Sequence, residues 1–581
     1  MDTVSAPTVQ VPDTGRVGRV TGPVVEVLGL GEVALHELVE LGVDGVPGEV
    51  TAIRDGLLVV QAYEYTGGLT PGQPVVATGR PLSARLTPDL LGQVFDGLLR
   101  PLATAGTWLV PGHASGMTYR RWAWTPTARE PSTVDEGDEL GTIGAAGSVP
   151  YRVLVPPGLR GPVRAVRPVG LVGAADPVAT VGGIPVTAVQ DWPVRRPRPF
   201  RSRRDAAVPL VTGQRVVDML HPVALGSAAG VPGGFGTGKT VLLQQIAKWC
   251  DADVIVYVGC GERGNELADA VAELSELDDP RTGGRLLDRT VVIANTSNMP
   301  LMAREASIHT AATVAEFYRD MGLDVVVIAD STSRWAEALR EFASRTGEVP
   351  AEEGYPATLA SALAAFYERA GRVETLGGRT GSVTVVGAVS PPGGDLTEPV
   401  TANTQRFVRA LWTLDRDLAY SRHYPAVGWA GSFSRDAAVL GPWYARNGDP
   451  GWTRRRARIL GLLADADRVS GLAELVGVGA LPAYERVVLL AGRLLREGVL
   501  QQSALSTSDA RSGPARSAAL ADAVLTVIDS GLGAVGRQVP AAGVEELDYG
   551  PLVRAREEVG DDLVEIRTRA DALRSALEGL R

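Results

Sequence analysis

The chain has 581 residues, which is too long for one ordinary hydrophobic core, so several domains are expected. Its net charge of −10 argues against a nucleic-acid binder with a broad basic surface, and we predict no nucleic-acid partner. The two cysteines, Cys250 and Cys260, form no CxxC pair, which disfavours a disulfide framework and fits a reducing cytosol. No run of about 20 apolar residues stands out, so we expect any membrane role to come through partners.

The first third of the chain has the pattern of β-structure. Residues 1–85 contain short β-like runs separated by glycine and proline, which predict an N-terminal β-barrel. A helical segment is expected at 90–99. Residues 111–185 are rich in turns and predict a separate β-rich insertion. The stretch 192–204 is rich in Pro and Arg; we interpret it as a solvated linker, with contact to a partner or phosphate as the alternative.

The middle and the end of the chain differ in their apolar patterns. In residues 86–110 and 186–440, near-continuous apolar runs alternate with helical patterns, which predicts a nucleotide-binding core around a buried parallel sheet. Beyond residue 440 the strand patterns vanish, and apolar residues recur at helical spacing. Residues 441–581 are therefore predicted to form a C-terminal helical domain, with a Ser-rich break at 503–517.

A glycine-rich loop carries the strongest chemical signal. Residues 233–240 read GGFGTGKT and fit GxxxxGK[ST], in which glycines let backbone N–H groups curl around phosphate oxygens. Lys239 can reach the β- and γ-phosphates of ATP, and the Thr240 hydroxyl can ligate Mg²⁺. A strand-like run precedes the loop and a helical pattern follows it, so a helix N-terminus would point at the phosphates. The predicted nucleotide-binding residues of the loop are Gly233, Gly234, Phe235, Gly236, Thr237, Gly238, Lys239 and Thr240.

Two further positions suit phosphoryl chemistry. Asp330 ends the apolar run 325–329, where a carboxylate at the carboxyl end of a buried parallel strand can hold Mg²⁺; the alternative is a capping role. Gly261-Glu262-Arg263 follows the strand-like run 254–258. There Glu262 could act as general base and Arg263 could organise charge near the γ-phosphate, unless the two form a surface ion pair.

These motifs closely resemble one family, the catalytic A subunits of V-type and archaeal A-type rotary ATPases, including bacterial ones. The segments that carry the resemblance are GGFGTGKT (233–240), GCGERGNE (259–266), ANTSNMPLMAREAS (294–307), ADSTSRWAEALRE (329–341), EEGYPATLAS (352–361) and SRHYPAVGW (421–429). The likeness covers nearly the whole chain, and the segment 111–185 falls where A subunits carry an insertion.

The resemblance implies a RecA-like P-loop core and ATP hydrolysis, or synthesis from ADP, coupled to H⁺ or Na⁺ transport. Three such chains would alternate with three B-type subunits around a rotor shaft, which the segment 462–475 would contact. Peripheral stalk subunits are further implied partners, and the membrane ring would be reached only through partners at the cytoplasmic face of the cell membrane. In the site, the resemblance implies that Glu262 activates water, Arg263 lies beside the γ-phosphate and Asp330 is the Walker B acid. An arginine from the B-type subunit would complete it.

The chain also departs from this family. Thr237 stands where eukaryotic A subunits carry cysteine. Tyr424 matches one of two aromatic residues at the family's adenine pocket, but the other position is Leu505. The loss of a stacking ring should weaken binding of the base by roughly 0.5–1.5 kcal/mol.

Three alternative classes share this core. A hexameric RNA translocase is disfavoured by the acidic composition of this chain. The ATPase of an export apparatus is disfavoured because such ATPases are shorter and lack the insertion. A non-catalytic B-like subunit would need neither Lys239 nor Glu262, and this chain has both.

Overall fold

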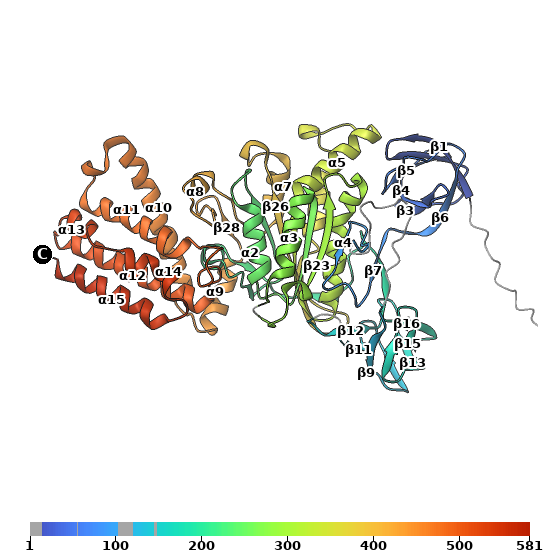
Figure 1. Cartoon of the computed structure of the whole chain (residues 1–581), viewed down its shortest axis with the longest axis horizontal. Coiled ribbons are helices and arrows are strands. Elements are labelled where there is room, and N and C mark those ends of the chain that lie inside the picture. Colours follow the sequence, from blue (N-terminus) through green and yellow to red (C-terminus); the bar gives the residue numbers. More distant parts are fainter. Residues whose placement is uncertain (1–13, 55, 103–119, 145–147, 280, 581) are drawn as a thin grey trace, which may run out of the picture.

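The structure is a computed structural model that describes residues 14–54, 56–102, 120–144, 148–279 and 281–580. The parts of the predicted domains that fall on residues 1–13, 103–119 and 145–147 lie outside the described residues. The molecule is elongated, with a β-barrel at one end, a sheet flanked by helices in the middle and a helical domain at the other end (Figure 1). A small β-domain projects from the side below the barrel. The predicted fold class is confirmed.

The N-terminal domain is a closed barrel of six strands in the order β1-β2-β5-β4-β3-β6. Its strands are β1 (Thr14–Thr21), β2 (Val24–Leu28), β3 (Glu37–Leu41), β4 (Val46–Arg54), β5 (Leu57–Ala62) and β6 (Pro74–Pro81). Alternate side chains such as Val25, Val27 and Val60 are fully buried in its interior, as the period-2 pattern of a strand requires.

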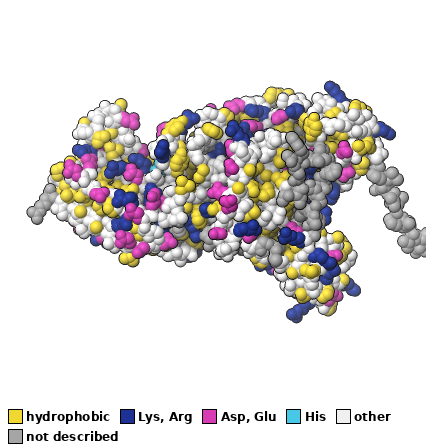
Figure 2. Space-filling model, in the orientation of Figure 1, with side chains coloured by type: hydrophobic (Ala, Val, Ile, Leu, Met, Phe, Trp, Pro, Cys, Tyr) yellow, Lys and Arg dark blue, Asp and Glu magenta, His cyan; other side chains and the backbone are white. Residues whose placement is uncertain are grey.

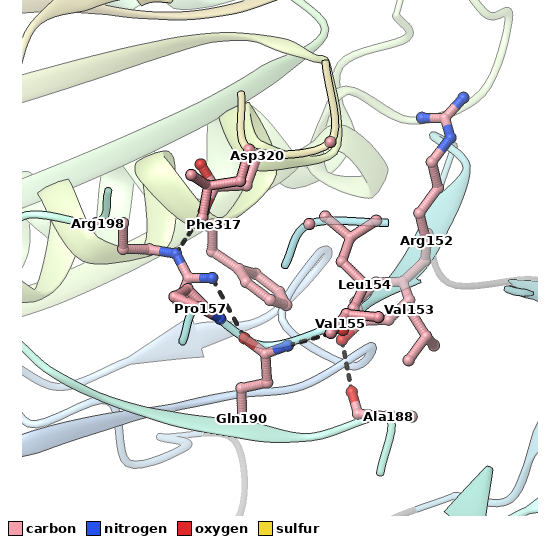
Figure 3. Close-up of a pocket in the computed structure, with 14 residues that line it drawn as sticks. Arg152, Val153, Leu154, Val155, Pro157, Ala188, Gln190, Arg198, Phe317 and Asp320 are labelled. Atoms are coloured by element: carbon pink, nitrogen blue, oxygen red, sulfur yellow. Dashed lines mark hydrogen bonds and ion pairs between the residues drawn. The ribbon is translucent and has the colours of Figure 1, made fainter. Parts of the chain in front are cut away.

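The insertion consists of two four-stranded sheets, β10-β13-β15-β16 and β12-β11-β9-β14. Its strands are β9 (Trp122–Pro126), β10 (Ser132–Val134), β11 (Glu139–Gly144), β12 (Tyr151–Leu154), β13 (Gly161–Arg164), β14 (Gly170–Val172), β15 (Pro177–Val181) and β16 (Ile184–Thr187). It packs on helix α4 (Leu301–Asp320), where the rings of Tyr151 and Phe317 meet edge to face at 5.9 Å. Figure 3 shows Phe317 and residues of β12 lining a cavity between the insertion and α4.

The core sheet follows the order β28-β27-β21-β26-β24-β22-β23-β8, and its strands are parallel from β27 to β8. These strands are β8 (Val94–Phe95), β21 (Ala228–Pro232), β22 (Val254–Glu262), β23 (Thr290–Thr296), β24 (Asp324–Asp330), β26 (Thr380–Val389), β27 (Ala410–Leu411) and β28 (Phe433–Ser434). Shorter strands border the sheet or pair beside it, namely β7 (Ser83–Leu86), β17 (Gln190–Pro193), β18 (Ser202–Arg203), β19 (Pro209–Leu210), β20 (Val223–Ala224) and β25 (Gly371–Glu374). The strands β21, β26, β24 and β22 lie side by side, so their carboxyl ends form one edge.

Helices connect these strands, as crossovers between parallel strands require. Besides α4 they are α1 (Arg215–Leu220), α2 (Lys239–Trp249), α3 (Gly264–Glu276), α5 (Thr332–Thr346), α6 (Leu359–Tyr367), α7 (Pro399–Phe407), α8 (Arg416–Tyr420) and α9 (Ala437–Arg446). The helical domain then contains α10 (Trp452–Val476), α11 (Ala483–Leu495), α12 (Pro514–Gly536), α13 (Ala541–Glu545), α14 (Gly550–Glu558) and α15 (Leu563–Gly579). Residues 501–513, within the predicted break, form no helix.

Two local expectations are wrong. No helix forms at 90–99, because Val94 and Phe95 form the edge strand β8 parallel to β23, and Gly92 adopts a left-handed conformation with φ +80°. The stretch 192–204 is not simply a solvated linker, because Arg198 is 3% exposed. Its Nε donates to Asp320 at 2.7 Å, and Figure 3 shows its guanidinium close to Phe317. An acidic partner 122 residues away neutralises its charge.

The helix α12 also differs from expectation, because its length and its mean hydropathy of 1.6 over 18 residues are those of a membrane-spanning helix. In the structure α12 is the central helix of the C-terminal domain and packs against α11 and α15. Apolar side chains around much of its circumference, including Leu520, Val524 and Ile528, are buried there. Burial on several sides explains the apolar composition.

An ion-pair network, here called the barrel–core joint, connects the barrel to α4; it consists of His36, Glu49, Tyr63, Arg195 and Glu305. The Arg195 guanidinium donates to both carboxylate oxygens of Glu305, at 2.6 and 2.9 Å, and lies 3.3 Å from Glu49. Glu49 also accepts a hydrogen bond from Tyr63 and lies 2.5 Å from the Nδ1 atom of His36. The two carboxylates are almost fully buried, so this network compensates their charges.

Candidate functional site

The glycine-rich loop connects β21 to α2, which begins at Lys239. Gly238 precedes the helix with φ +83°, and a Cβ atom there would lie 3.1 Å from the ring of Tyr424. Only glycine satisfies both the left-handed backbone and the close ring. The loop is braced from inside, since the Thr237 hydroxyl donates to the Gly234 carbonyl at 2.8 Å and the Gly233 N–H donates to Val389 at 3.1 Å.

Lys239 lies at the carboxyl edge of the sheet, with its ammonium beside the end of β26. Its Nζ donates to the hydroxyl of Ser390 and, at 3.4 Å, to the carbonyl of Val389. Burial lowers the pKa of Lys239, and the nearby carboxylates of Asp330 and Glu262 act in the opposite direction. Lys239 and Lys248 are the only lysines in the sequence.

Asp330 is the last residue of β24, in the middle of the same edge, and is 3% exposed. The Tyr257 hydroxyl donates to its Oδ2 at 3.3 Å, and the Thr240 hydroxyl lies close enough to the carboxylate to lower its pKa. Burial raises the pKa of Asp330, while Lys239 acts against this shift. A carboxylate and a hydroxyl side by side are hard oxygen donors, which fit a Mg²⁺ ion with its remaining positions on water and phosphate.

Glu262 ends the neighbouring strand β22, so the two carboxylates face the same space from adjacent strands. Burial raises the pKa of Glu262, and the negative charge of Asp330 raises it further. A carboxyl group with a raised pKa is a better proton acceptor than an ordinary glutamate. Arg263 follows as the N-cap residue of α3 and is exposed to solvent.

These residues line one open cleft, whose empty volume is about 1920 Å³ including the space open to solvent. The predicted residues that line it are Gly234, Phe235, Gly236, Gly238, Lys239, Thr240, Glu262, Arg263 and Asp330. Gly233 and Thr237 do not line it, since they build the loop from inside. The cleft also contains side chains that the sequence reasoning did not select, namely Glu266, Arg304, Arg334, Ser390 and Arg416.

A usable sequence signal existed for some of these unselected residues. Glu266, Arg304 and Arg334 lie within the segments that carry the family resemblance, and Arg334 comes four residues after Asp330. Ser390 directly follows a buried parallel strand, the position at which ligands of such sheets bind. The carboxyl end of each apolar run should therefore be searched for polar residues, even where no motif is present.

Tyr424 lies beside the loop rather than in the cleft, with its ring next to Gly238 and 41% exposed. Its carbonyl accepts a hydrogen bond from the N–H of Gln502 at 2.8 Å, which brings the start of the Ser-rich break close to it. Leu505 in this segment is 97% exposed.

Known family models match residues in each of the four domains. The ATP synthase alpha/beta family matches with its nucleotide-binding domain over residues 213–434 and its beta-barrel domain over 17–79. The ATPsynthase alpha/beta subunit barrel-sandwich domain matches 117–195, and the C-terminal domain of V and A type ATP synthase matches 441–532.

Relatives of this type align over nearly the full length. The V-type ATP synthase alpha chain of Anaeromyxobacter dehalogenans is 48% identical over 544 residues, which are 92% of this chain and 94% of the relative. The chain belongs to the A (alpha) subunits of the V/A-type ATP synthases. The corresponding chain of the A-type ATP synthase of Thermofilum pendens is 44% identical over 560 residues, covering 94% of this chain and 93% of that relative. The family predicted from the motifs is thus confirmed, and the protein is the catalytic, nucleotide-binding chain of an ion-coupled ATP synthase.

A solved structure shares the fold at lower identity. EscN, the ATPase of the type III secretion system of enteropathogenic E. coli, superposes with a TM-score of 0.62 and 22% identity. The match covers 88% of this chain and 100% of that one. At this identity the likeness shows a common fold alone.

Proposed function

We propose that this catalytic chain binds Mg–ATP in the cleft at the carboxyl edge of the sheet and that Glu262 activates the water that attacks the γ-phosphate. The observation that carries the proposal is the convergence of Lys239, Asp330 and Glu262, from three separate elements, on one cleft. Burial works against the charge of all three groups. A polyanion with a divalent cation would compensate these charges, which is the arrangement expected of a phosphoryl-transfer site.

Each residue has a defined role in this proposal. The backbone N–H groups of residues 233–240 and the N-terminus of α2 surround the phosphates, and the Lys239 ammonium lies against the β- and γ-phosphates. Thr240 and Asp330 would hold Mg²⁺, which offsets negative charge on the phosphate oxygens when bound. Glu262 accepts a proton from the attacking water, and Arg263 stabilises charge on the γ-phosphate. ADP and phosphate are the products, and the same groups serve the reverse reaction.

The base site follows from the position of Tyr424. We propose that the adenine ring packs on the exposed face of Tyr424, beside the loop. Leu505 contributes apolar contact from the facing segment but no stacking, so base selectivity depends mainly on Tyr424.

The partners are proposed from the family and from the shape of the chain. Three copies would alternate with three B-type subunits around a rotor shaft, with peripheral stalk subunits outside. The turn between α10 and α11 projects from the helical domain (Figure 1), and Leu475, Val476 and Val478 are more than half exposed there. This turn, together with the end of the segment 462–475, is our proposed contact with the shaft.

The complex is membrane-associated, and we propose that this chain lies at the cytoplasmic face and reaches the membrane ring through partners. Figure 2 shows basic and acidic side chains interspersed over the visible face of the core and the helical domain. Such a face suits contacts with protein neighbours better than uniform binding to a polyanion.

Steady-state ATP turnover tests this proposal. The chain is measured alone, with its B-type partner, and with a partner whose arginine at the interface is replaced by alanine. We expect slow turnover alone and a rise of about 10³–10⁵ with the intact partner, which is the usual contribution of an arginine supplied in trans. Full activity of the chain alone, or full activity with the alanine partner, would contradict a site shared between subunits.

A further inference from the structure

Ser390 occupies a position where the main parts of the site meet. It directly follows β26, and β26 lies between β21, which leads into the glycine-rich loop, and β24, which ends at Asp330. Neither the motifs nor the roles proposed above involve this residue. The sheet order alone places it between the lysine and the metal-binding carboxylate.

On the side of the loop, Ser390 and its neighbour hold two groups. The Ser390 hydroxyl accepts a hydrogen bond from Nζ of Lys239. The carbonyl of Val389 accepts from the same Nζ at 3.4 Å and from the N–H of Gly233 at 3.1 Å. The end of β26 therefore holds both Gly233, the first residue of the loop, and the ammonium group of Lys239, the residue at which α2 begins.

On the side of Asp330, the first turn of α5 holds Ser390 in place. The Ser390 N–H donates to the hydroxyl of Ser333 at 2.8 Å. One residue earlier, the hydroxyl of Thr332 donates to the carbonyl of Ala388 at 2.9 Å. Because α5 begins at Thr332, two residues after Asp330, these bonds tie the end of β26 to the segment that directly follows the carboxylate.

We propose that Ser390 is a positioning residue for the ATPase reaction, whose hydroxyl holds the Lys239 ammonium in line with the γ-phosphate. A lysine ammonium ends a flexible four-carbon chain and has three donors, so a fixed acceptor restricts it to one of many orientations. The contribution of Lys239 is needed most when charge develops on the transferred phosphoryl group. Losing the hydroxyl should therefore lower kcat more than it raises KM. The inference depends on the proposed function of the cleft.

The test compares variants in the complex reconstituted with the B-type partner. In Ser390→Ala we expect kcat to fall about tenfold, the size of one hydrogen bond to a charged group, with KM for ATP changed less than about threefold. Ser390→Thr keeps the hydroxyl and should restore most of kcat. The matched control is Ser382→Ala, which removes a buried hydroxyl at the other end of β26, where it donates to Asp324 at 2.6 Å.

Three results would overturn the proposal: wild-type kcat in Ser390→Ala, an equal loss in Ser390→Thr, or an equal loss in the Ser382→Ala control. The last would show that β26 is simply weakened. Binding of ATP to Lys239→Ala, measured by calorimetry, separates this inference from the proposed function. If Lys239→Ala binds ATP normally, the cleft itself is wrongly assigned. If that variant loses binding while Ser390→Ala keeps full turnover, only the positioning role fails.

Discussion

Two buried charged clusters in this chain show opposite electrostatic behaviour. In the cleft, burial raises the pKa of Asp330 and Glu262 and lowers that of Lys239. At the barrel–core joint, burial also acts to raise the pKa of Glu49 and Glu305, but their partners outweigh it, and both pKa values fall below the ordinary range.

The two clusters differ in contact geometry rather than in burial. Arg195 lies 2.6 Å from Glu305 and 3.3 Å from Glu49, whereas Lys239 makes no salt bridge with Asp330 or Glu262 among the described residues. At the joint, the charges of the buried carboxylates are compensated by Arg195 within the chain, as a structural ion pair requires. The cleft leaves its charges incompletely paired, which is the condition under which a charged ligand contributes most.

The largest expected effect is the loss of Lys239. Lys239→Ala should abolish tight ATP binding, because the cation that we propose to face the β- and γ-phosphates is removed from a site with two carboxylates. Calorimetric titration with Mg–ATP measures the loss. Lys248→Ala is the matched control, since it removes a lysine from the last turn of the same helix. Unchanged affinity in Lys239→Ala would remove the loop from the proposed mechanism.

Replacing the proposed base should separate binding from chemistry. In the complex with the B-type partner, Glu262→Gln should lower kcat by about 10²–10⁴ while ATP still binds, because the amide cannot accept the proton from water. Glu276→Gln, at the exposed end of α3, should leave turnover unchanged. Normal turnover in Glu262→Gln would show that another group activates the water.

A substitution in the barrel–core joint should change the free energy of unfolding rather than the rate of catalysis. Arg195→Ala leaves Glu305 and Glu49 buried without their main cation, so the free energy of unfolding should fall by about 3 kcal/mol, the lower end for broken buried pairs. Denaturant unfolding of the isolated chain measures it, with exposed Arg196→Ala as the control. Equal stability of the two variants would contradict the view that the joint is a compensated pair.

The smallest effect concerns pH. The hydrogen bond to Glu49 raises the pKa of His36, against burial. The stability that His36 contributes is therefore fully present below its unfolded pKa of about 6.5, and is lost as pH rises through the higher folded value. The side chain is 62% exposed, so the contribution should stay below about 1 kcal/mol.

Thermal unfolding of wild type and His36→Gln measures this contribution. We expect the two midpoints to differ at a pH below the unfolded pKa of about 6.5 and to converge as the pH rises through the raised folded pKa. A difference that grows with rising pH would reverse the assigned sign.

The cleft was predictable where chemistry follows a local pattern. The glycine-rich loop, Asp330 and Glu262 each lie within a few residues of the end of an apolar run, and strands that are parallel and adjacent bring such ends together. Ser390 also follows an apolar run but belongs to no motif, and its place between the loop and Asp330 depends on the sheet order, which was not predictable from the runs.

The wrong expectations share one cause, which is pairing between residues distant in sequence. Val94 and Phe95 form a strand instead of a helix because β23, some 200 residues later, pairs with them at the sheet edge. Arg198 is buried because Asp320 compensates its charge. The broad apolar surface of α12 is matched by α11 and α15. The composition and periodicity of a segment cannot predict which distant residues it will pair with.

The scarcity of lysine makes the cleft accessible to chemical labelling. An amine-directed reagent has only Lys239, Lys248 and the chain terminus to modify, and a lowered pKa leaves Lys239 with more neutral amine than an ordinary lysine. A protease that cuts after lysine releases residues 240–248 from the unfolded chain only when Lys239 and Lys248 are both unmodified, whereas cleavage after Lys248 requires only that Lys248 is unmodified. The yield of this peptide relative to all cleavage after Lys248 therefore reports how far bound nucleotide protects Lys239, in the assembled complex and without any engineered probe.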